Sequence, residues 1–515
     1  MKAERLSREQ KGCAVEPIRP RYIIALDQGT TSSRAVLIDR GGTPCAIAHN
    51  EFPQIFPQPG WVEHNPIDIL TSQLDALTEL LDAHDVQPAE VAAIGITNQR
   101  ETAIVWNRKT GEPVYNAIVW QCRRTTPLME KLGADPRISA MIAEKTGLVC
   151  DPYFSASKIA WILDNVEGAR AAAERGELAF GTVDAWLVWK LTQGAVHATD
   201  PTNASRTMLY NIHTGAWDDE LLELFGIPRS MMPEVRPSAS FFGKTSSPGV
   251  IEGIPIMGVA GDQQAALFGQ GCFNPGDAKC TYGTGCFLLM NTGTHAQLSR
   301  NSLITTVAAC GPGTSGLRYA LEGSVFMGGA LVQWLRDELE MIEGGEEAER
   351  LAEEAGGTGG VYVVPAFTGL GAPYWDADAR GAIFGLTRGT TRAHIVRACL
   401  EALAYQVLDL VRAMESDAGM RLDALSVDGG ASANAFLMQF QADIMERTLD
   451  RPTCRETTAL GAAFLAGLAC GFWSDESELR ALRTSDDVFH PSRDHQWRRE
   501  RIDGWNEAVA RVRTN

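Results

Sequence analysis

Several common features are missing from this sequence, and each absence excludes a class of protein. The longest strongly apolar stretch, Leu460 to Trp473, has 14 residues. A membrane-spanning helix needs roughly 18 to 20 such residues, so this stretch is interpreted as a buried helix and no membrane insertion is expected. The first residues, MKAERLSREQKGCAVEPIRP, are polar and contain no apolar signal core. Residues 1–20 are therefore predicted to form a disordered extension.

Positive charge and paired cysteines are also scarce. The chain has 46 basic and 64 acidic side chains and a net charge of −18, which repels nucleic acid and acidic membranes. Any phosphate must then be held locally, by backbone amides and a metal ion. None of the 11 cysteines forms a CxxC pair, and no histidines cluster with ligand spacing. A disulfide framework, a structural zinc site and a zinc hydrolase are not expected, and a reducing cytoplasm fits best.

The length and the pattern of the chain indicate two layered domains. With 515 residues the chain is too long for a single hydrophobic core. Strand and helix signals alternate along it, which favours an α/β fold. We place an N-terminal domain at residues 21–270 and a C-terminal domain at residues 271–515.

The first domain opens with a predicted β-hairpin. The β-rich runs YIIALD and RAVLID are joined by the turn QGTTSS, and Asp27 ends the first run. A helix is predicted from Pro66 to His84, because Asn65 is a good N-cap and Pro66 suits the first helical position. Its expected apolar stripe comprises Ile67, Leu70, Leu74, Leu77 and Leu81. The run VAAIGIT then predicts a buried strand.

The second domain repeats these signals. KCTYGTGCFLLMN and the run from Ser302 to Leu321 are typical of hairpins, and a long helix is expected near His394 to Met414. The strand ALSVDGG precedes another helix near Ala433. Asp27 and Asp428 each end a strand and precede glycine and small hydroxyl residues. This likeness suggests two related domains that face one nucleotide, although two unrelated turns would look the same.

Two apparent nucleotide motifs are set aside. Residues 311–316, GPGTSG, match GxGxxG but precede a short strand where a dinucleotide fold requires a long helix, so they are interpreted as a hairpin turn. Gly243-Lys244-Thr245 resembles the end of a P-loop, but Ser238 occupies the required upstream glycine position.

The turn after Asp27 is a stronger phosphate signal. Gly29 lets the backbone approach a phosphate, and the next three residues, Thr30, Thr31 and Ser32, offer hydroxyl and amide donors. Arg34 could neutralise charge on a transferring phosphoryl group, and Asp27 could hold Mg²⁺ through water. A tight polar hairpin with a surface arginine is the structural alternative.

Six further residues are substrate candidates, most of them with a structural alternative. Asp262, in AGDQQ, is either a helix N-cap or a base that takes a hydroxyl proton, and Gln263 beside it could bind a polyol. Arg100-Glu101 follows a buried strand and is either a solvated ion pair or a grip on neighbouring hydroxyls. Trp120 could line the pocket or the core, and Tyr153 has the same ambiguity.

Glycine-rich turns mark the expected nucleotide side. They are Tyr282-Gly-Thr284-Gly, Gly328-Gly329 and Gly429-Gly430 with Asn434. Each could cradle phosphate or simply permit a turn. Thr458-Ala-Leu-Gly-Ala-Ala is interpreted as a closely packed helix and not as a site.

Together these residues resemble the FGGY family of carbohydrate kinases, and within it the members that phosphorylate glycerol. The resemblance runs from about Tyr22 to Trp473. It is carried by ALDQGTTSSRA, GWVEHNP, GITNQRET, WQCRRT, TNASRTML, AGDQQAALFGQ, TYGTGCF and VPAFTGLGAPYWD, with YFSASKIAWILDN and GAIFGLTRGTTRAHIVRACLE as the family signatures. It implies two ribonuclease-H-like, actin-like ATPase domains with the active site in the cleft between them.

The resemblance also implies roles for individual residues. Glycerol would be bound by Arg100, Glu101, Tyr153, Asp262 and Gln263, with Trp120 and Phe287 on its apolar side. Asp262 would be the general base. ATP phosphates would meet Thr30, Thr31, Ser32, Arg34, Thr284, Gly329 and Gln333, with Gly430 and Asn434 beside the nucleoside. Asp27 and Asp262 would lie near Mg²⁺.

The remaining expectations concern assembly, regulation and alternatives. The resemblance implies a homo-oligomer, dimer or tetramer. Residues 245–253, TSSPGVIEG, lack the paired glycines and the arginine of the loop that binds fructose 1,6-bisphosphate in some relatives, so that feedback is not expected. A kinase for another sugar, such as a ketopentose, and an actin-like filament or chaperone ATPase are the alternative functions. Arg100, Glu101 and Trp120 favour a small triol over both.

Overall fold

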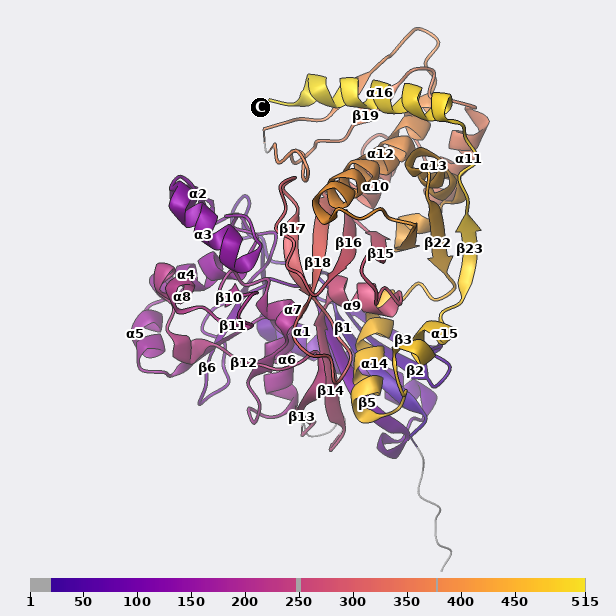
Figure 1. The fold of residues 1–515 in the computed structure, drawn as a ribbon. Coiled ribbons are helices and arrows are strands. Elements are labelled where there is room, and N and C mark those ends of the chain that lie inside the picture. Colours follow the sequence, from indigo (N-terminus) through magenta and orange to yellow (C-terminus); the bar gives the residue numbers. More distant parts are fainter. Residues whose placement is uncertain (1–19, 247–251, 377, 515) are drawn as a thin grey trace, which may run out of the picture.

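The computed structural model describes residues 20–246, 252–376 and 378–514 of the chain. Two β-sheets form the centres of two stacked halves, with the first half below the second in Figure 1. The predicted extension at residues 1–20 and most of the loop at residues 245–253 lie outside the described residues.

The first sheet has six strands. Their spatial order is β13 (Ala239–Lys244), β14 (Pro255–Gly261), β5 (Val91–Asn98), β1 (Tyr22–Gln28), β2 (Ser32–Asp39) and β3 (Pro44–Glu51). Strands β1, β2 and β3 are antiparallel neighbours, whereas β5 and β14 extend the sheet in parallel from β1. The predicted hairpin and the buried strand VAAIGIT are thus confirmed.

The second sheet has seven strands and repeats this scheme. Their order is β17 (Ile304–Ala308), β18 (Arg318–Val325), β16 (Cys286–Gly293), β15 (Ala278–Tyr282), β21 (Ala424–Asp428), β22 (Thr448–Pro452) and β23 (Ser485–Phe489). β15 pairs antiparallel with β16 and parallel with β21, as β1 does with β2 and β5. The GPGTSG segment joins β17 to β18, which confirms it as a hairpin turn. The expected α/β fold of two ribonuclease-H-like domains is confirmed.

Helices and small ribbons surround the sheets. The helices are α1 (Pro66–His84), α2 (Thr126–Gly133), α3 (Pro136–Thr146), α4 (Ser155–Asn165), α5 (Ala169–Glu174), α6 (Val183–Leu191), α7 (Pro201–Ala204), α8 (Asp219–Leu224), α9 (Asp262–Gly269), α10 (Gly329–Asp337), α11 (Gly345–Glu354), α12 (Arg392–Ala418), α13 (Ala435–Met445), α14 (Thr457–Cys470), α15 (Glu476–Leu482) and α16 (His495–Val512). The ribbons pair β4 (Glu63–His64) with β7 (Ala117–Ile118), β6 (Ile104–Asn107) with β8 (Leu178–Gly181), β9 (Ala198–Thr199) with β12 (Glu234–Val235), β10 (Tyr210–Asn211) with β11 (Ala216–Trp217) and β19 (Tyr362–Val364) with β20 (Ala382–Phe384).

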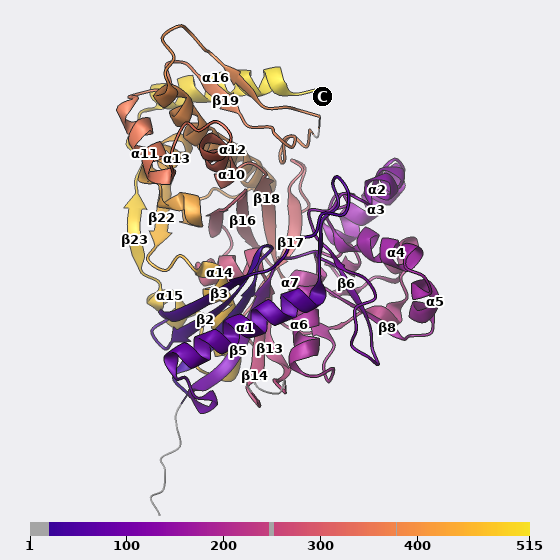
Figure 2. The ribbon, with the colours of Figure 1, turned by 180° about the vertical axis from the view of Figure 1, so that it is seen from behind.

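Helix α1 covers one face of the first sheet (Figure 2). The side chain of Asn65 accepts a hydrogen bond from the amide of Ile67, which confirms the N-cap. The predicted stripe is wrong in part, because Ile67 is exposed and the buried face instead contains Ser72 and Gln73. Ser72 meets the hydroxyl of Ser33, so a polar residue outside the predicted stripe belongs to the buried face.

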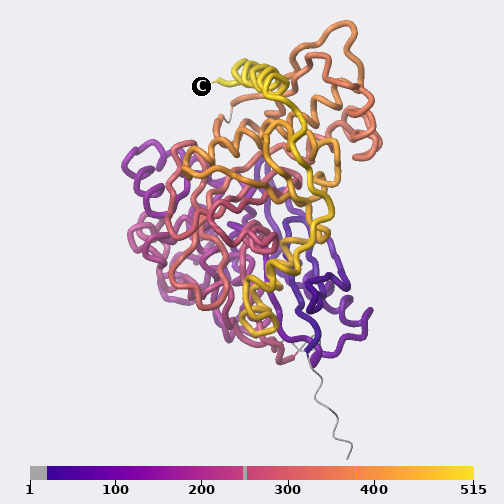
Figure 3. The backbone as a smooth tube through the Cα atoms, turned by 45° about the vertical axis from the view of Figure 1, so that its right-hand side comes forward, coloured from indigo at the N-terminus to yellow at the C-terminus, as the bar shows by residue number. Residues whose placement is uncertain are grey.

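Helix α14 packs on the other face of the same sheet, although it lies near the C-terminus. Figure 3 follows the chain down from the second half to α14 and back up to α16. The contact is backbone to backbone: a Cβ on Gly461 would lie 1.8 Å from the carbonyl oxygen of Ala265 in α9. This fits the interpretation of the TALGAA segment as a closely packed helix. The boundary placed after residue 270 therefore separates two parts of the sequence, but α14 from the second part packs on the sheet of the first part.

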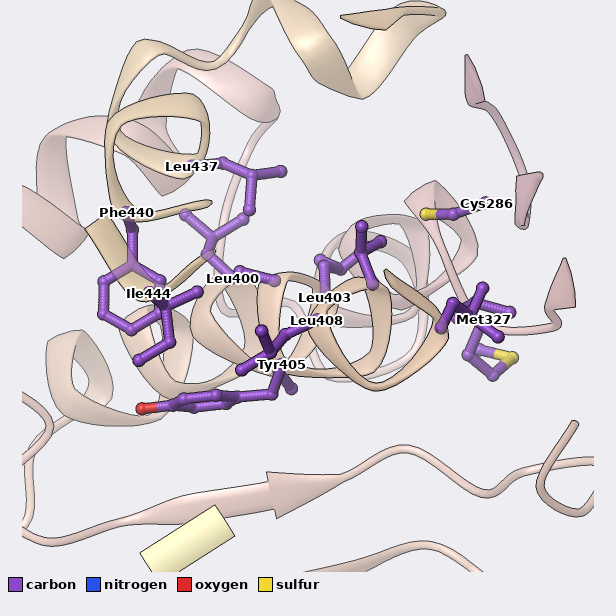
Figure 4. Close-up of a cluster of buried hydrophobic side chains, with 14 of the residues drawn as sticks. Cys286, Met327, Leu400, Leu403, Tyr405, Leu408, Leu437, Phe440 and Ile444 are labelled. Atoms are coloured by element: carbon purple, nitrogen blue, oxygen red, sulfur yellow. The ribbon is translucent and has the colours of Figure 1, made fainter. Parts of the chain in front are cut away.

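The core of the second half is built on α12, which the sequence predicts near residues 394–414. Leu400, Leu403 and Leu408 of this helix belong to one buried apolar cluster with Leu437 of α13 and Cys286 of β16 (Figure 4). No helix in the described residues is both long enough and apolar enough to cross a bilayer. The described cysteines are all free thiols.

Candidate active site

The turn of the β1–β2 hairpin is held from below by two glutamines. Gln99 donates to the carbonyl of Gly29 at 3.0 Å, and Gln54 donates to that of Thr30 at 3.1 Å. The amide of Gly29 closes the turn on the carbonyl of Ser32. Thr30 in this turn is half-buried and Thr31 is exposed.

A buried histidine joins the two glutamines, and the sequence analysis did not identify it. His64 Nε2 lies 2.7 Å from Gln54 Oε1, and its Nδ1 lies 3.4 Å from Gln99 Nε2. These contacts assign the neutral ring, with the proton on Nε2. Burial lowers the pKa of His64 to about 4, so the ring keeps this state at neutral pH. His64, in the motif GWVEHNP, thus supports the hairpin turn through the two glutamines.

Acidic side chains converge beside the same hairpin. The register pairs Asp27 with Arg34, and the guanidinium lies 4.0 Å from Asp27 and 3.4 Å from Glu456. Burial raises the pKa of Asp27 to about 7, Arg34 opposes the shift, and the charges of Asp262 and Glu456 add to it. The charge at position 262 thus acts on the carboxyl at position 27, and a metal ion held by both stays a prediction.

Asp262 stands where β14 meets α9. It is the first residue of the helix and Gly261 is the N-cap, so the N-cap reading is wrong by one position. Its Oδ1 accepts from the amide of Gln263 at 2.7 Å and lies 3.1 Å from Nε of Arg100. Gln263 in turn accepts from the ammonium of Lys279 at 2.5 Å. Because Lys279 occupies the amide oxygen, Nε2 of Gln263 is left as the donor.

Arg100 and Glu101 are buried, so the interpretation as a solvated ion pair is wrong. They are 3% and 1% exposed. The backbone of Glu101 has φ of 61°, in a region that non-glycine residues seldom adopt and that is frequent at functional sites. Arg100 donates two hydrogen bonds to Glu322, at 2.6 and 2.8 Å, and Arg206 donates to Glu101 at 2.5 Å. Arg206 and Glu322 were not identified from the sequence.

Aromatic rings close one side of this cluster. Trp120 is half-buried and meets the ring of Tyr153 edge to face, with centroids 5.6 Å apart. Its Nε1 donates to the hydroxyl of Thr30 at 3.0 Å, which joins this wall to the hairpin turn. The ammonium of buried Lys158 donates to the carbonyls of residues 152, 153 and 154 and so fixes the loop that carries Tyr153. Phe287, on β16, shares a sheet face with Glu322.

The glycine-rich turns meet at the second sheet. The amide of Gly329 donates to the carbonyl of Gly283, and a Cβ on Gly429 would clash with the carbonyl of Tyr282 at 2.7 Å. Three turns that are distant in sequence are thus packed together. Gln333 is exposed on α10, next to them in the chain, and the side chain of Asn434 caps α13.

The matched Asp turns are not equivalent in the fold. Asp27 lies at the end of β1, and the hairpin partner β2 follows directly. The turn after Tyr282, between β15 and β16, is the topological counterpart of the turn after Asp27. Asp428 ends β21, the counterpart of β5, and leads into a helix. The inference of two related domains is confirmed, but the pairing of these two turns is wrong.

Carbohydrate kinases match the chain along most of its length. The model of the FGGY family of carbohydrate kinases, N-terminal domain, matches residues 22–269, and that of the C-terminal domain matches residues 278–470. The glycerol kinase of Pasteurella multocida is 60% identical over 495 residues, which are 96% of this chain and 98% of that protein. That of Haemophilus influenzae (strain Rd) is 59% identical over 494 residues, which are 95% of this chain and 97% of that protein.

Solved structures agree with this likeness. The crystal structure of Plasmodium falciparum glycerol kinase with ADP is 40% identical in sequence and has a TM-score of 0.90. The match covers 95% of this chain and 98% of that one. A xylulose kinase from Lactobacillus acidophilus, 22% identical with a TM-score of 0.85 over 95% of this chain and 98% of that one, shares the fold. The chain belongs to the FGGY family of carbohydrate kinases.

Proposed function

We propose that the chain transfers the γ-phosphoryl group of ATP to a terminal hydroxyl of glycerol and forms sn-glycerol 3-phosphate and ADP. The observation that carries this proposal is the position of Asp262. Its carboxylate lies against the buried Arg100, and its charge acts on Asp27 at the phosphate hairpin. Both ends of a phosphoryl transfer to a small hydroxylated acceptor are therefore provided.

The unused hydrogen-bonding atoms of the pocket suit a small triol. Oε2 of Glu101, Oδ2 of Asp262, Nε2 of Gln263 and the hydroxyl of Tyr153 have no hydrogen bond to another described residue. Arg100 donates two hydrogen bonds to Glu322 and one to Gln264, and its Nε forms an ion pair with Asp262 at 3.1 Å. Donors and acceptors both remain, as three adjacent hydroxyl groups require.

Asp262 would act as the general base. Its free Oδ2 accepts the proton of the substrate hydroxyl while that oxygen forms a bond to the γ-phosphorus, and the bond from phosphorus to the β,γ-bridging oxygen of ATP breaks. Arg100 holds the other carboxylate oxygen at 3.1 Å and so keeps Oδ2 turned to the pocket. The rings of Trp120 and Tyr153 exclude water from that side.

The nucleotide would lie between the hairpin and the glycine-rich turns. Thr30, Thr31, Ser32 and Arg34 are proposed to meet its phosphates from the first half. Thr284, Gly329 and Gln333 meet them from the second half, with Gly430 and Asn434 beside the nucleoside.

Mg²⁺ fits the donors at the hairpin. The described residues contain no group of three or more His, Cys, Asp or Glu side chains arranged to hold a metal ion. Mg²⁺ typically binds one or two carboxylates, waters and substrate phosphates, and Asp27 and Asp262 supply the carboxylates. When bound with ATP, the ion would neutralise phosphate charge.

The test is ADP release coupled to a reporter, with glycerol, dihydroxyacetone, D-xylulose or no acceptor. We expect turnover with glycerol to exceed that with D-xylulose at least tenfold, and little release without acceptor. Equal release in the blank would contradict the proposal and favour a plain ATPase. The cytoplasmic location and the homo-oligomeric state, dimer or tetramer, stay predictions, and gel filtration with light scattering would test the second.

A further inference from the structure

A cluster of five charged side chains connects the two halves at the pocket. Arg100, Glu101, Arg206 and Asp262 belong to the first half, and Glu322 lies on β18 of the second. Four of them are at most 3% exposed, and only Asp262 is partly exposed, with 31% of its side chain. Such a cluster is costly to bury unless each charge has partners.

Glu322 is the centre of this cluster. Its two oxygens accept from Arg100 at 2.6 and 2.8 Å and from Arg206 at 3.3 Å each. The two guanidinium groups lower the pKa of Glu322 to about 2 despite its burial, so the carboxylate stays ionised. Without Glu322, the guanidinium groups of Arg100 and Arg206 would lose the carboxylate that lies between them.

Each arginine then holds one oxygen of a second carboxylate: Arg100 contacts Asp262, and Arg206 contacts Glu101. Because Glu322 takes both terminal nitrogens of Arg100, only Nε is directed at Asp262. Released from Glu322, Arg100 could form a forked pair with Asp262 and occupy both of its oxygens. Arg206 holds Oε1 of Glu101 and leaves Oε2 without a hydrogen bond to a described residue.

We propose that Glu322 and Arg206 are positioning residues, which hold Arg100 and Glu101 so that one oxygen each of Asp262 and Glu101 stays free for the acceptor. This inference rests on the proposed function and adds the second half of the chain to acceptor recognition. Arg206 follows α7 closely, and the amide of Gly261 donates to the hydroxyl of Thr202 within that helix.

The central test is a double-mutant cycle between Glu322→Gln and Arg100→Ala. Glu322→Gln should raise the glycerol KM at least tenfold and leave the ATP KM within twofold. If Glu322 acts through Arg100, Glu322→Gln should add less than twofold to the glycerol KM in the Arg100→Ala background. Independent, multiplying effects would overturn the inference.

A matched control separates positioning from stability. Glu401 is also buried and accepts from Arg397 at 2.8 Å, but within α12. Glu401→Gln should lower the unfolding temperature without changing the glycerol KM. Arg206→Lys keeps the charge but loses the fork, and it should raise the glycerol KM several-fold.

The outcomes remain distinguishable. If the unmodified protein does not phosphorylate glycerol, the proposed function fails. If it does and Glu322→Gln keeps the original KM, only the positioning inference fails. Where Glu322→Gln does not fold, the charge-balanced pair Glu322→Gln with Arg206→Met replaces it, and a normal glycerol KM in that variant would equally overturn the inference.

Discussion

Replacing Asp262 by Asn should greatly slow catalysis while it preserves the site. The asparagine oxygen can still accept from the amide of Gln263 and from Nε of Arg100, the two contacts that Oδ1 makes at 2.7 and 3.1 Å. What is lost is a group that accepts a proton. General bases contribute about 10²- to 10⁴-fold, so kcat should fall at least a hundredfold, or about 2.7 kcal/mol in the barrier.

The stability cost of this change should be small. The side chain of Asp262 is 31% exposed, and Arg100 keeps its forked pair with Glu322. A partly solvated ion pair contributes about 1 kcal/mol or less. The unfolding temperature should therefore change by no more than about 4 °C, and the ATP KM by less than about threefold, because the residues proposed to meet the ATP phosphates and Asp27 are unchanged.

The assay is coupled ADP release at saturating glycerol with ATP varied, together with a thermal unfolding curve. Asp218→Asn is the matched control, because Asp218 caps α8 away from the pocket. A folded Asp262→Asn protein with kcat within tenfold of the original would refute the role of general base. A loss of kcat that follows a loss of folded protein would show a structural role instead.

Three further substitutions test packing, electrostatics and the pocket loop. Gly461→Ala puts a Cβ 1.8 Å from a backbone carbonyl of α9 and should destabilise the chain by about 3 kcal/mol in chemical unfolding; Gly357→Ala, whose Cβ has no neighbour within 4 Å, should not. Burial raises the pKa of Asp184 to about 7, so its ionisation disfavours the folded state as pH rises from about 4 to 7, by about 4 kcal/mol. Asp184→Asn should lack this loss, and a stability difference that stays constant between pH 4 and 8 would contradict the reasoning. Lys158→Met removes three bonds to the loop of Tyr153 and should raise the glycerol KM about tenfold; an unchanged KM would leave Lys158 only a structural role.

Local signals in the sequence predicted several of the elements. The hairpin after Tyr22, the strand VAAIGIT and the capped helix α1 each depend on neighbouring residues, and all are present. The buried face of α1 was predicted wrongly because apolar residues alone were counted. Ser72 and Gln73 face the sheet, where they bond to Ser33 and to the carbonyl of Arg34.

The candidate pocket was predictable only in part. Residues within recognisable motifs, such as Asp262 and Arg100, were identified, and the structure brings them together. Their geometry could not be read, because Asp262 follows the N-cap and Arg100 is buried. The similarity of the Asp27 and Asp428 turns misled, since two turns can share residues while they follow different strands of the fold.

The missed residues Arg206 and Glu322 show why a buried charge is harder to interpret than a motif. Glu322 is the one acid in RYALEGSVF, which contains β18. Because burying a lone carboxylate is costly, a cationic partner is expected. That requirement indicates that a partner exists but not where it is, because contact across the two halves joins positions 222 residues apart in the chain. A single acid within an apolar strand therefore predicts an arginine at the facing surface, and the arginines without another local explanation are the candidates. Arg100, which directly follows a buried strand, meets that criterion, and through it Glu322 becomes part of the pocket.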